Sequence, residues 1–184
     1  TLCAVCQQSQ QRLSQKLIRL HVVANSDAPD DQAVKLLVRD AVLREAALAL
    51  ENTDDPEAAL QAAIPALTRA ANETLCSQGC HETAAVSLRR ELFPTREYDT
   101  FRLPAGVYKS LRVTIGKGEG RNWWCVVFPA LCLPASSEEL TQACLAAGFT
   151  EGEVAVLTGD TETVELEFKT LEFLSKLKKV LWDA

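Results

Sequence analysis

The spacing of apolar residues changes twice along this chain, and the order of these patterns limits the folds open to it. Residues 18–23 alternate apolar and polar side chains, which is typical of a half-buried strand. Residues 28–51 and 56–79 repeat apolar side chains every three or four positions, which indicates two amphipathic helices. Alternation then returns in three further segments, 84–92, 107–116 and 123–128. We therefore predict the element order β-α-α-β-β-β.

This order favours an α+β fold, with a mainly antiparallel sheet of about four strands backed by the two long helices. Helical patterns continue over 135–148 and 161–182 and predict a helical C-terminal extension. We divide the chain into three parts: a flexible N-terminal tail (1–16), a core domain (17–132) and a C-terminal extension packed on the core (133–184). A chain of 184 residues is long enough to bury such a core without needing disulfides or a metal ion to stabilise it.

Charge and composition exclude some classes of function. The net charge is −6 with basic and acidic residues interspersed, which argues against a general nucleic-acid surface. No apolar run is long enough for a membrane span. The first residues, TLCAVCQQSQQ, resemble what is left after a signal peptide or anchor is trimmed, so we expect an exported protein.

Seven cysteines leave several arrangements open, at positions 3, 6, 76, 80, 125, 132 and 144. One is a zinc site that combines Cys3 and Cys6 with Cys76, Cys80 and His81. A second is a local disulfide, such as Cys125 with Cys132, and a third is simple thiols. We predict no metal, because Cys3 and Cys6 lie in a tail without a structured turn.

Signals for catalysis are weak. The glycines of GKGEG open into a strand, whereas a phosphate-binding loop opens into a helix, so we interpret them as a hairpin loop. His21 and His81 are the only imidazoles, and no nucleophile signature surrounds them. We therefore predict a protein that is not an enzyme and needs no cofactor. The alternative is a thiol- or metal-dependent extracytoplasmic hydrolase that uses Cys125 or the Cys76, Cys80 and His81 cluster.

The sheet face opposite the helices is the candidate docking surface, because Trp, Tyr and Arg dominate interface energetics. An alternative is that the segment from residue 133 onward covers this face. The candidate partner-binding residues are Arg19, His21, Asn25, Tyr108, Arg112, Asn122, Trp123 and Trp124. Since neighbouring side chains of a strand point to opposite faces, we predict that Trp124 packs against the helices with Val126 and Phe128, and that Trp123 lies on the docking face.

Two stretches, IRLHVVANSDAPDDQAVKLLVRDAVL and FPTREYDTFRLPAGVYKSLRVTIGKGEGRNWWCVVFPALC, resemble the stage II sporulation protein R family of endospore-forming bacteria. The likeness extends over about residues 18–132, and the spacing between the two blocks also agrees. The matching motif positions are Asn25, Ser26, Asp27, Pro104, Ala105, Gly106, Asn122, Trp123, Trp124, Cys125, Pro129 and Cys132.

The resemblance implies a signalling role rather than catalysis. Members of this family are exported from the forespore into the space between the forespore and mother-cell membranes. There they activate a membrane-embedded aspartic protease of the mother cell, stage II sporulation protein GA, which processes the precursor of sigma factor E. The resemblance therefore implies a secreted, membrane-proximal protein with a protein partner, and no catalytic residue is carried over.

Overall fold

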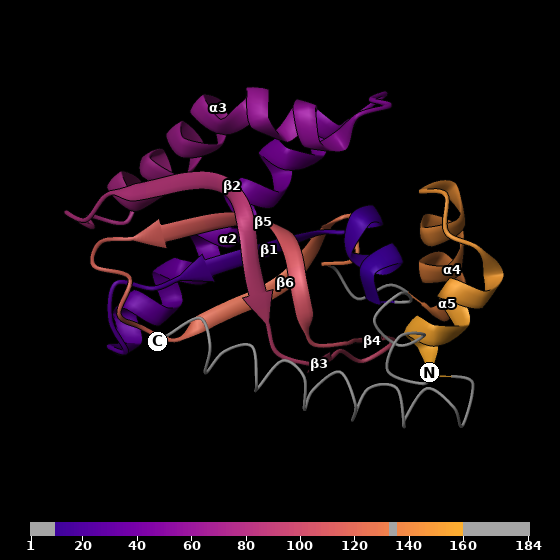
Figure 1. Ribbon diagram of the computed structural model, residues 1–184. Helices are drawn as coiled ribbons and strands as arrows, with labels where there is room; N and C mark the ends of the chain where they lie inside the picture. The colour runs from indigo at the N-terminus through magenta and orange to yellow at the C-terminus, as the bar shows by residue number, and fades with distance from the viewer. Residues whose placement is uncertain (1–9, 133–135, 160–184) are drawn as a thin grey trace. The chain divides into compact units, whose positions relative to one another are not determined.

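The computed structural model describes residues 10–132 and 136–159, which belong to two compact units. We call Ile18–Arg89 together with Ser110–Phe128 the sheet unit, and Thr1–Leu17, Arg90–Lys109 and Pro129–Ala184 the terminal unit. In this division, residues 90–109, which belong to the predicted core of residues 17–132, group with the terminal segments. In the described residues the elements follow an α+β order, and the predicted fold class is confirmed (Figure 1).

The main sheet is built from β1 (Ile18–Val23), β2 (Ala84–Phe93), β5 (Gly106–Ile115) and β6 (Asn122–Phe128). Its strands lie in the order β2-β5-β1-β6, and β1 pairs with β6 in antiparallel fashion. The last residues of β2 and the first residues of β5 belong to the terminal unit. All three alternating segments predicted after residue 83 are strands of this sheet.

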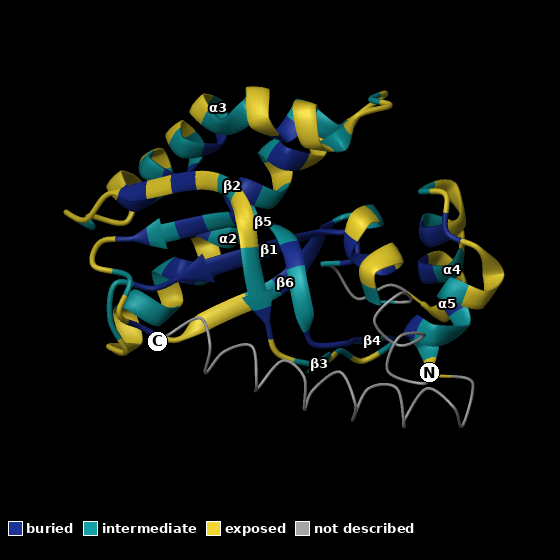
Figure 2. Ribbon diagram, in the orientation of Figure 1, coloured by how far each residue is buried: buried dark blue, intermediate teal, exposed yellow. Residues whose placement is uncertain are grey.

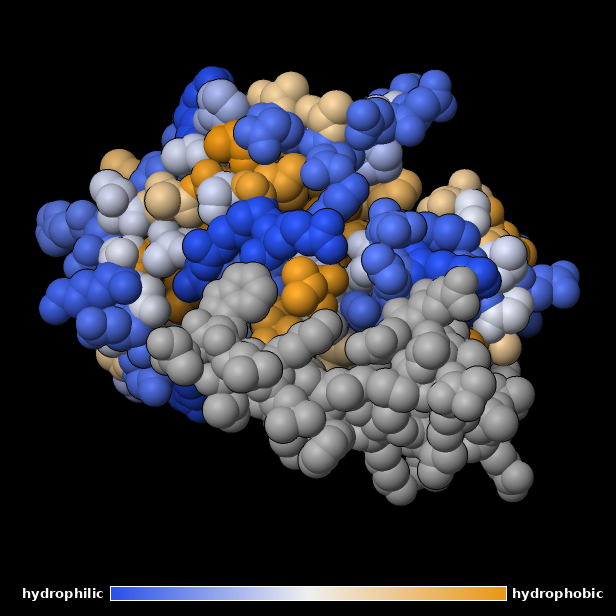
Figure 3. Space-filling view, in the orientation of Figure 1, coloured by the Kyte–Doolittle hydropathy of each residue, from blue (hydrophilic) through white to orange (hydrophobic). Residues whose placement is uncertain are grey.

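The two long helices, α2 (Pro29–Leu50) and α3 (Pro56–Ser77), pack against each other along their length. Each begins with a proline, which suits the first turn because its missing N–H has no helical acceptor there. Asp55 caps α3 by accepting a 3.0 Å hydrogen bond from the backbone N–H of Ala58. Figure 3 shows hydrophobic side chains on the surface over α3, next to hydrophilic ones.

Strand β1 is buried on both faces, whereas its alternation predicts a half-buried strand. Every residue of β1 is buried, including Arg19 and His21 (Figure 2). Alternation identifies the two faces of a strand, but it does not report whether the polar face meets solvent. An open docking face along β1 is therefore not found.

The pairing of β1 with β6 reverses the predicted orientation of the two tryptophans. Trp123 lies opposite Val22, and Trp124 lies opposite His21. Directly paired residues of antiparallel strands point to the same face, so Trp123 shares the face of Val22. The Trp123 ring also contacts Arg39 of α2. The prediction for the tryptophans was wrong, because alternation gives relative orientation and only the register assigns the face.

Among its described residues, the terminal unit contains a short helix over residues 10–16, the hairpin strands β3 (Arg96–Glu97) and β4 (Arg102–Leu103), and two helices. These helices are α4 (Ser137–Ala146) and α5 (Glu151–Thr158), and a capping box opens each of them. The predicted flexible tail needs correction over residues 10–16, which are helical and bury Leu13. The predicted helix over 161–182 lies outside the described residues.

Candidate functional site

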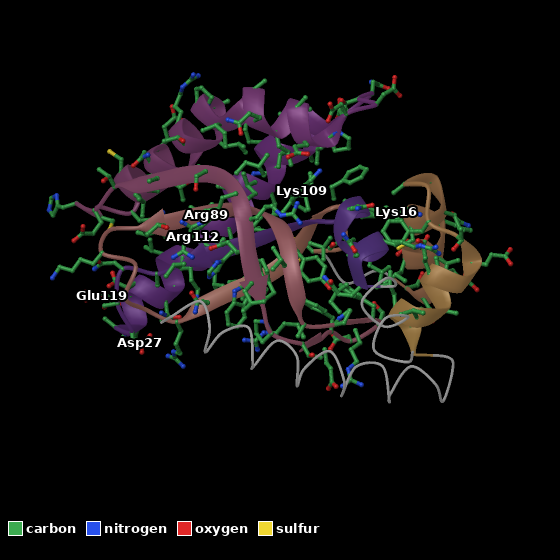
Figure 4. The ribbon with its side chains drawn as sticks, in the orientation of Figure 1. Lys16, Asp27, Arg89, Lys109, Arg112 and Glu119 are labelled. Atoms are coloured by element: carbon green, nitrogen blue, oxygen red, sulfur yellow. The ribbon has the colours of Figure 1, made fainter. Side chains whose placement is uncertain are left out.

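Three strands of the sheet unit bring polar side chains together around His21. Nε2 of His21 lies 2.8 Å from Oδ1 of Asn122, and Nδ1 lies 3.2 Å from Nη1 of Arg112. The Trp124 ring lies beside the imidazole, with 5.7 Å between the ring centres. Figure 4 shows the position of Arg112 on the sheet. Four of the predicted docking residues therefore form one cluster.

The partners of His21 define its tautomer. A guanidinium only donates hydrogen bonds, so Nδ1 accepts from Arg112. Nε2 then carries the hydrogen that Oδ1 of Asn122 accepts, a tautomer assigned from the partners. Both ring nitrogens are thus engaged in hydrogen bonds. This arrangement orients the ring and occupies the nitrogen that a general base would need.

A second polar cluster joins the turn after β1 to the start of α2. We call residues 24–27 the ANSD turn. The Ser26 hydroxyl donates a 2.6 Å hydrogen bond to Oδ2 of Asp31, and Nδ2 of Asn25 donates a 3.0 Å bond to the same oxygen. The hydrogen bonds from Ser26 and then from Asn25 lower the pKa of Asp31, although its burial acts in the opposite direction. The carboxylate therefore holds the turn against the helix.

The same turn holds the loop between β5 and β6, residues 116–121, which we call the hairpin loop. Oδ1 of Asn25 accepts from the N–H of Lys117 at 3.0 Å, and Oδ1 of Asp27 accepts from the N–H of Arg121 at 2.7 Å. The backbone N–H of Gly120 donates to the carbonyl of Ala24 at 2.9 Å. A Cβ at Gly120 would collide with the Ser26 carbonyl oxygen, so the approach of the two loops requires a glycine.

Lys35 of α2 ties the helix to the far end of the hairpin loop. Its buried Nζ donates to Oε1 of Gln32 at 2.6 Å and to the carbonyl oxygen of Arg121 at 3.1 Å. Gln32 in turn donates to the carbonyl oxygen of Ser26 at 2.9 Å. Burial, followed by the charge of Arg121, lowers the pKa of Lys35. The ANSD turn, the start of α2 and the hairpin loop thus form one hydrogen-bonded block.

This block fixes a surface that we call the tip surface, made of the exposed residues Asp27, Arg121, Asn122 and Trp123 and the half-buried Arg39. The Trp123 side chain is 36% exposed, and the Arg39 guanidinium lies 4.4 Å from the centre of its ring. Nη2 of Arg39 is itself 2.8 Å from Oδ1 of Asp40, which orients the guanidinium. A partly exposed tryptophan stacked on an arginine is a strong candidate anchor for a protein partner.

The predicted docking residues have different environments. Arg19 and Tyr108 are fully buried, and in the terminal unit Tyr108 donates to the carbonyl oxygen of Pro104 at 2.7 Å. His21 is buried, whereas Asn122 and Trp123 are exposed and the others are half-buried. Arg39, Lys35 and Asp31 were missed by the sequence analysis. Arg39 and Lys35 contact segments that are distant in the sequence, so no local pattern singles them out. Asp31 contacts Asn25 and Ser26, only six and five positions away, so the acidic residue that follows the ANSD turn was a local signal that could have been used.

The cysteines also separate into classes. Cys125 and Cys132 are each disulfide-bonded, and their pairing with each other stays a prediction. Cys76 and Cys80 are free, as is Cys144, whose burial raises its pKa to about 11. Cys3 and Cys6 lie outside the described residues. Within residues 10–132 and 136–159, no three His, Cys, Asp or Glu side chains are grouped so that they could hold a metal ion.

A cavity of about 460 Å³ lies in the terminal unit. It is bounded by Asp99 and Thr100, between β3 and β4, and by residues of α4 and α5. Its titratable lining groups are the carboxyls of Asp99 and Glu151, with no imidazole or thiol among the lining residues. The buried charged side chain of Lys35, whose hydrogen bonds are described above, lies in the sheet unit and not at this cavity.

In the part of the chain that the structure describes, no helix has the length and apolar character needed to cross a membrane.

Comparisons with known proteins agree with the resemblance seen in the sequence. A family model described as Stage II sporulation protein R matches residues 14–138. The curated Stage II sporulation protein R of Bacillus subtilis (strain 168) is 37% identical over 118 residues, which make up 62% of this chain and 53% of the relative. The chain thus spans about half the length of the curated relative that it matches. No solved structure matches it. Because the family match extends over most of the chain and includes the ANSD turn, the hairpin loop and both adjacent tryptophans, the chain belongs to the stage II sporulation protein R family.

Proposed function

We propose that this chain is an exported signalling protein of sporulation that acts by binding a protein partner. Membership of the stage II sporulation protein R family supports a role in sporulation. The partner that the family resemblance implies is the membrane-embedded aspartic protease of the mother cell, stage II sporulation protein GA. Binding activates this protease, which then processes the precursor of sigma factor E.

The observation that carries the proposal is the rigid presentation of Trp123. Its ring is partly exposed and stacked on Arg39, at a point where the adjoining hairpin loop is held by the ANSD turn. A side chain that is ordered before binding loses less conformational entropy when the complex forms. Tryptophan and arginine are also the residues most enriched at the energetic centres of interfaces. The tip surface is therefore the docking site.

The oxidation state of two cysteines supports a location outside the cytoplasm. Cys125 and Cys132 are disulfide-bonded, and disulfides persist mainly in oxidising, extracytoplasmic environments. We place the protein in the space between the forespore and mother-cell membranes, where it reaches the extracytoplasmic part of the protease.

The same observation favours signalling over the thiol-dependent hydrolase. A cysteine in a disulfide has no thiolate to attack a substrate, and Cys125 is in this state. His21, the imidazole on the sheet, has both ring nitrogens engaged by Asn122 and Arg112. These contacts support a structural role for both residues.

The test is a Trp123→Ala variant, assayed for processing of the sigma factor E precursor in sporulating cells that lack the natural copy. We expect processing to be lost, and we expect the purified variant to fail to co-purify with the extracytoplasmic part of the protease. Leu48→Ala is the matched control, because Leu48 is also an exposed apolar residue and is 62% exposed on α2. Circular dichroism establishes that both variants fold.

Normal processing and normal co-purification with a folded Trp123→Ala variant would exclude the tip surface as the docking site. Normal co-purification combined with lost processing would instead separate binding from activation. Failure of the parent chain to bind or activate the protease would overturn the proposed partner itself.

A further inference from the structure

Two free thiols lie at the C-terminal end of α3 and have no part in the proposed signalling surface. Cys76 is in the last turn of the helix and is exposed, whereas Cys80 is half-buried in the segment that follows. The helix ends at Ser77, so the two cysteines lie on either side of its end. Because both are accessible, both can meet a small molecule from solution.

The backbone brings these two cysteines together. The N–H of Gly79 donates to the carbonyl oxygen of Cys76 at 3.0 Å, and the N–H of Cys80 donates to the carbonyl oxygen of Leu75 at 3.0 Å. This pair of hydrogen bonds is the Schellman motif, in which the chain folds back over the last helical turn. Gly79 has a φ of +68°, which a glycine adopts at little cost. Cys80 is therefore held against the turn that contains Cys76.

The other end of the connecting segment is also anchored. Oδ1 of Asn72 accepts from the N–H of Ala84 at 2.9 Å, and Nδ2 of Asn72 donates to the carbonyl oxygen of Ala84 at 2.9 Å. The segment between α3 and β2 thus leaves the helix and enters the sheet at fixed points. This restricts the distance over which Cys80 can move away from Cys76.

From these contacts we propose that Cys76 and Cys80 form a reversible dithiol–disulfide pair that exchanges with a low-molecular-weight disulfide. The Cys76 thiolate attacks one sulfur of the small disulfide, forms a mixed disulfide and releases one small thiolate, which takes up a proton. The Cys80 thiolate then attacks Sγ of Cys76 and releases the second small thiolate. The two protein thiols are oxidised by two electrons, and the small disulfide is reduced to two thiols.

Cys144 provides an internal comparison. It is also a free cysteine, but it is buried in α4, and burial raises its pKa to about 11. Exchange requires an accessible thiolate, so Cys144 should stay reduced while the folded protein reacts. Among the free cysteines of residues 10–132 and 136–159, the reaction is thus restricted to the end of α3 by accessibility as well as by proximity. It is independent of the signalling proposal, because it needs no protein partner.

The test uses the whole purified chain, treated with glutathione disulfide, quenched with iodoacetamide and digested with trypsin. Cleavage after Arg69 and Arg89 gives a peptide of residues 70–89 that contains Cys76 and Cys80 and no other cysteine. We expect this peptide to lose two hydrogens and to carry no alkyl group. After reduction with dithiothreitol and a second treatment with iodoacetamide, it should carry two alkyl groups.

Single variants separate the two steps. Cys80→Ser should stop at a glutathione adduct on Cys76, whereas Cys144→Ser should close the disulfide at the rate of the parent. The proposal is overturned if the parent peptide keeps two alkylated thiols, carries two glutathione adducts, or is joined to a peptide that contains another cysteine. A rate that depends on Cys144 would overturn it as well.

Discussion

The hydroxyl of Ser26 lies 2.6 Å from Oδ2 of Asp31 and joins the turn after β1 to the first turn of α2. Asn25 donates to the same carboxylate oxygen at 3.0 Å, so one acidic side chain gathers two side chains of the ANSD turn. A carboxylate is a stronger acceptor than a neutral oxygen. The block that presents the tip surface therefore depends on the ionised form of Asp31.

The pH dependence of Asp31 can be predicted from this contact. The pKa of Asp31 is below 3.8 in the folded state. The ionised carboxylate therefore contributes to the free energy of unfolding above pH 3.8, and this contribution is lost as pH falls through the folded-state pKa. Asp31→Asn should lower the free energy of unfolding by about 1 kcal/mol at pH 7, a value reduced by partial exposure. Urea unfolding at several pH values measures this difference.

Asp30→Asn is the matched control for Asp31→Asn, because Asp30 is also in the first turn of α2 but is exposed. It isolates the interaction of a carboxylate with the helix dipole. If the difference in the free energy of unfolding between Asp31→Asn and the parent stays unchanged at pH 2, the role of the charged form is contradicted.

Gly120→Ala should destabilise the sheet unit and weaken partner binding together. The added Cβ would meet the backbone carbonyl oxygen of Ser26, which cannot rotate away as a side chain can. The expected loss is about 1–3 kcal/mol, typical of overpacking. Thermal unfolding and co-purification with the protease measure the two effects.

In Gly152→Ala the Cβ meets nothing within 4 Å, so this control should be neutral or slightly stabilising. Equal stability of the two variants would show that the hairpin loop can move away from the ANSD turn.

Lys16 should anchor the helix over residues 10–16 within the terminal unit. Its Nζ lies 2.7 Å from Oε2 of Glu153 and 2.8 Å from the carbonyl oxygen of Gly148 (Figure 4 shows its position). Burial alone would raise the pKa of Glu153, but hydrogen bonds from Lys16 and from Thr150 hold it below 4.5. Lys16→Met keeps most of the side-chain length and removes the charge, so amide hydrogen exchange over residues 10–16 should become faster.

Arg12→Met is the control for Lys16, because Arg12 is an exposed cation in the same short helix. It should leave hydrogen exchange in the helix close to that of the parent. Equal acceleration by both variants would indicate a general effect of lost charge rather than the contact with Glu153.

Cys144 should make the protein less stable at alkaline pH. Its pKa is raised from 9.0 to about 11, so the folded state keeps the proton longer than the unfolded state does. The protonated thiol makes its full contribution to the free energy of unfolding below pH 9, and this contribution is lost as pH rises through about 11. The total loss is at most about 3 kcal/mol. Urea unfolding of the parent and of Cys144→Ala between pH 8 and about 11 measures this slope. If both proteins lose stability equally over this range, Cys144 is not the group responsible.

Local patterns in the sequence were sufficient for the elements themselves. The helices α2 and α3 follow from apolar spacing, from a proline in each first turn and, for α3, from the Asp55 cap. The sheet strands follow from alternation, and Ser136 with Glu139 opens α4 as a capping box. These signals involve residues within a few positions of each other, so they are present in the sequence whatever the rest of the chain does.

The site depends on contacts between residues far apart in the sequence. Asn25 and Lys117 are 92 positions apart, and Asp27 and Arg121 are 94 apart, yet their hydrogen bonds join the ANSD turn to the hairpin loop. The sequence by itself determined that Trp123 and Trp124 point to opposite faces, because side chains alternate along a strand. Only the pairing of β1 with β6 decided that Trp123 is the one that meets Arg39, since register is set by nonlocal packing.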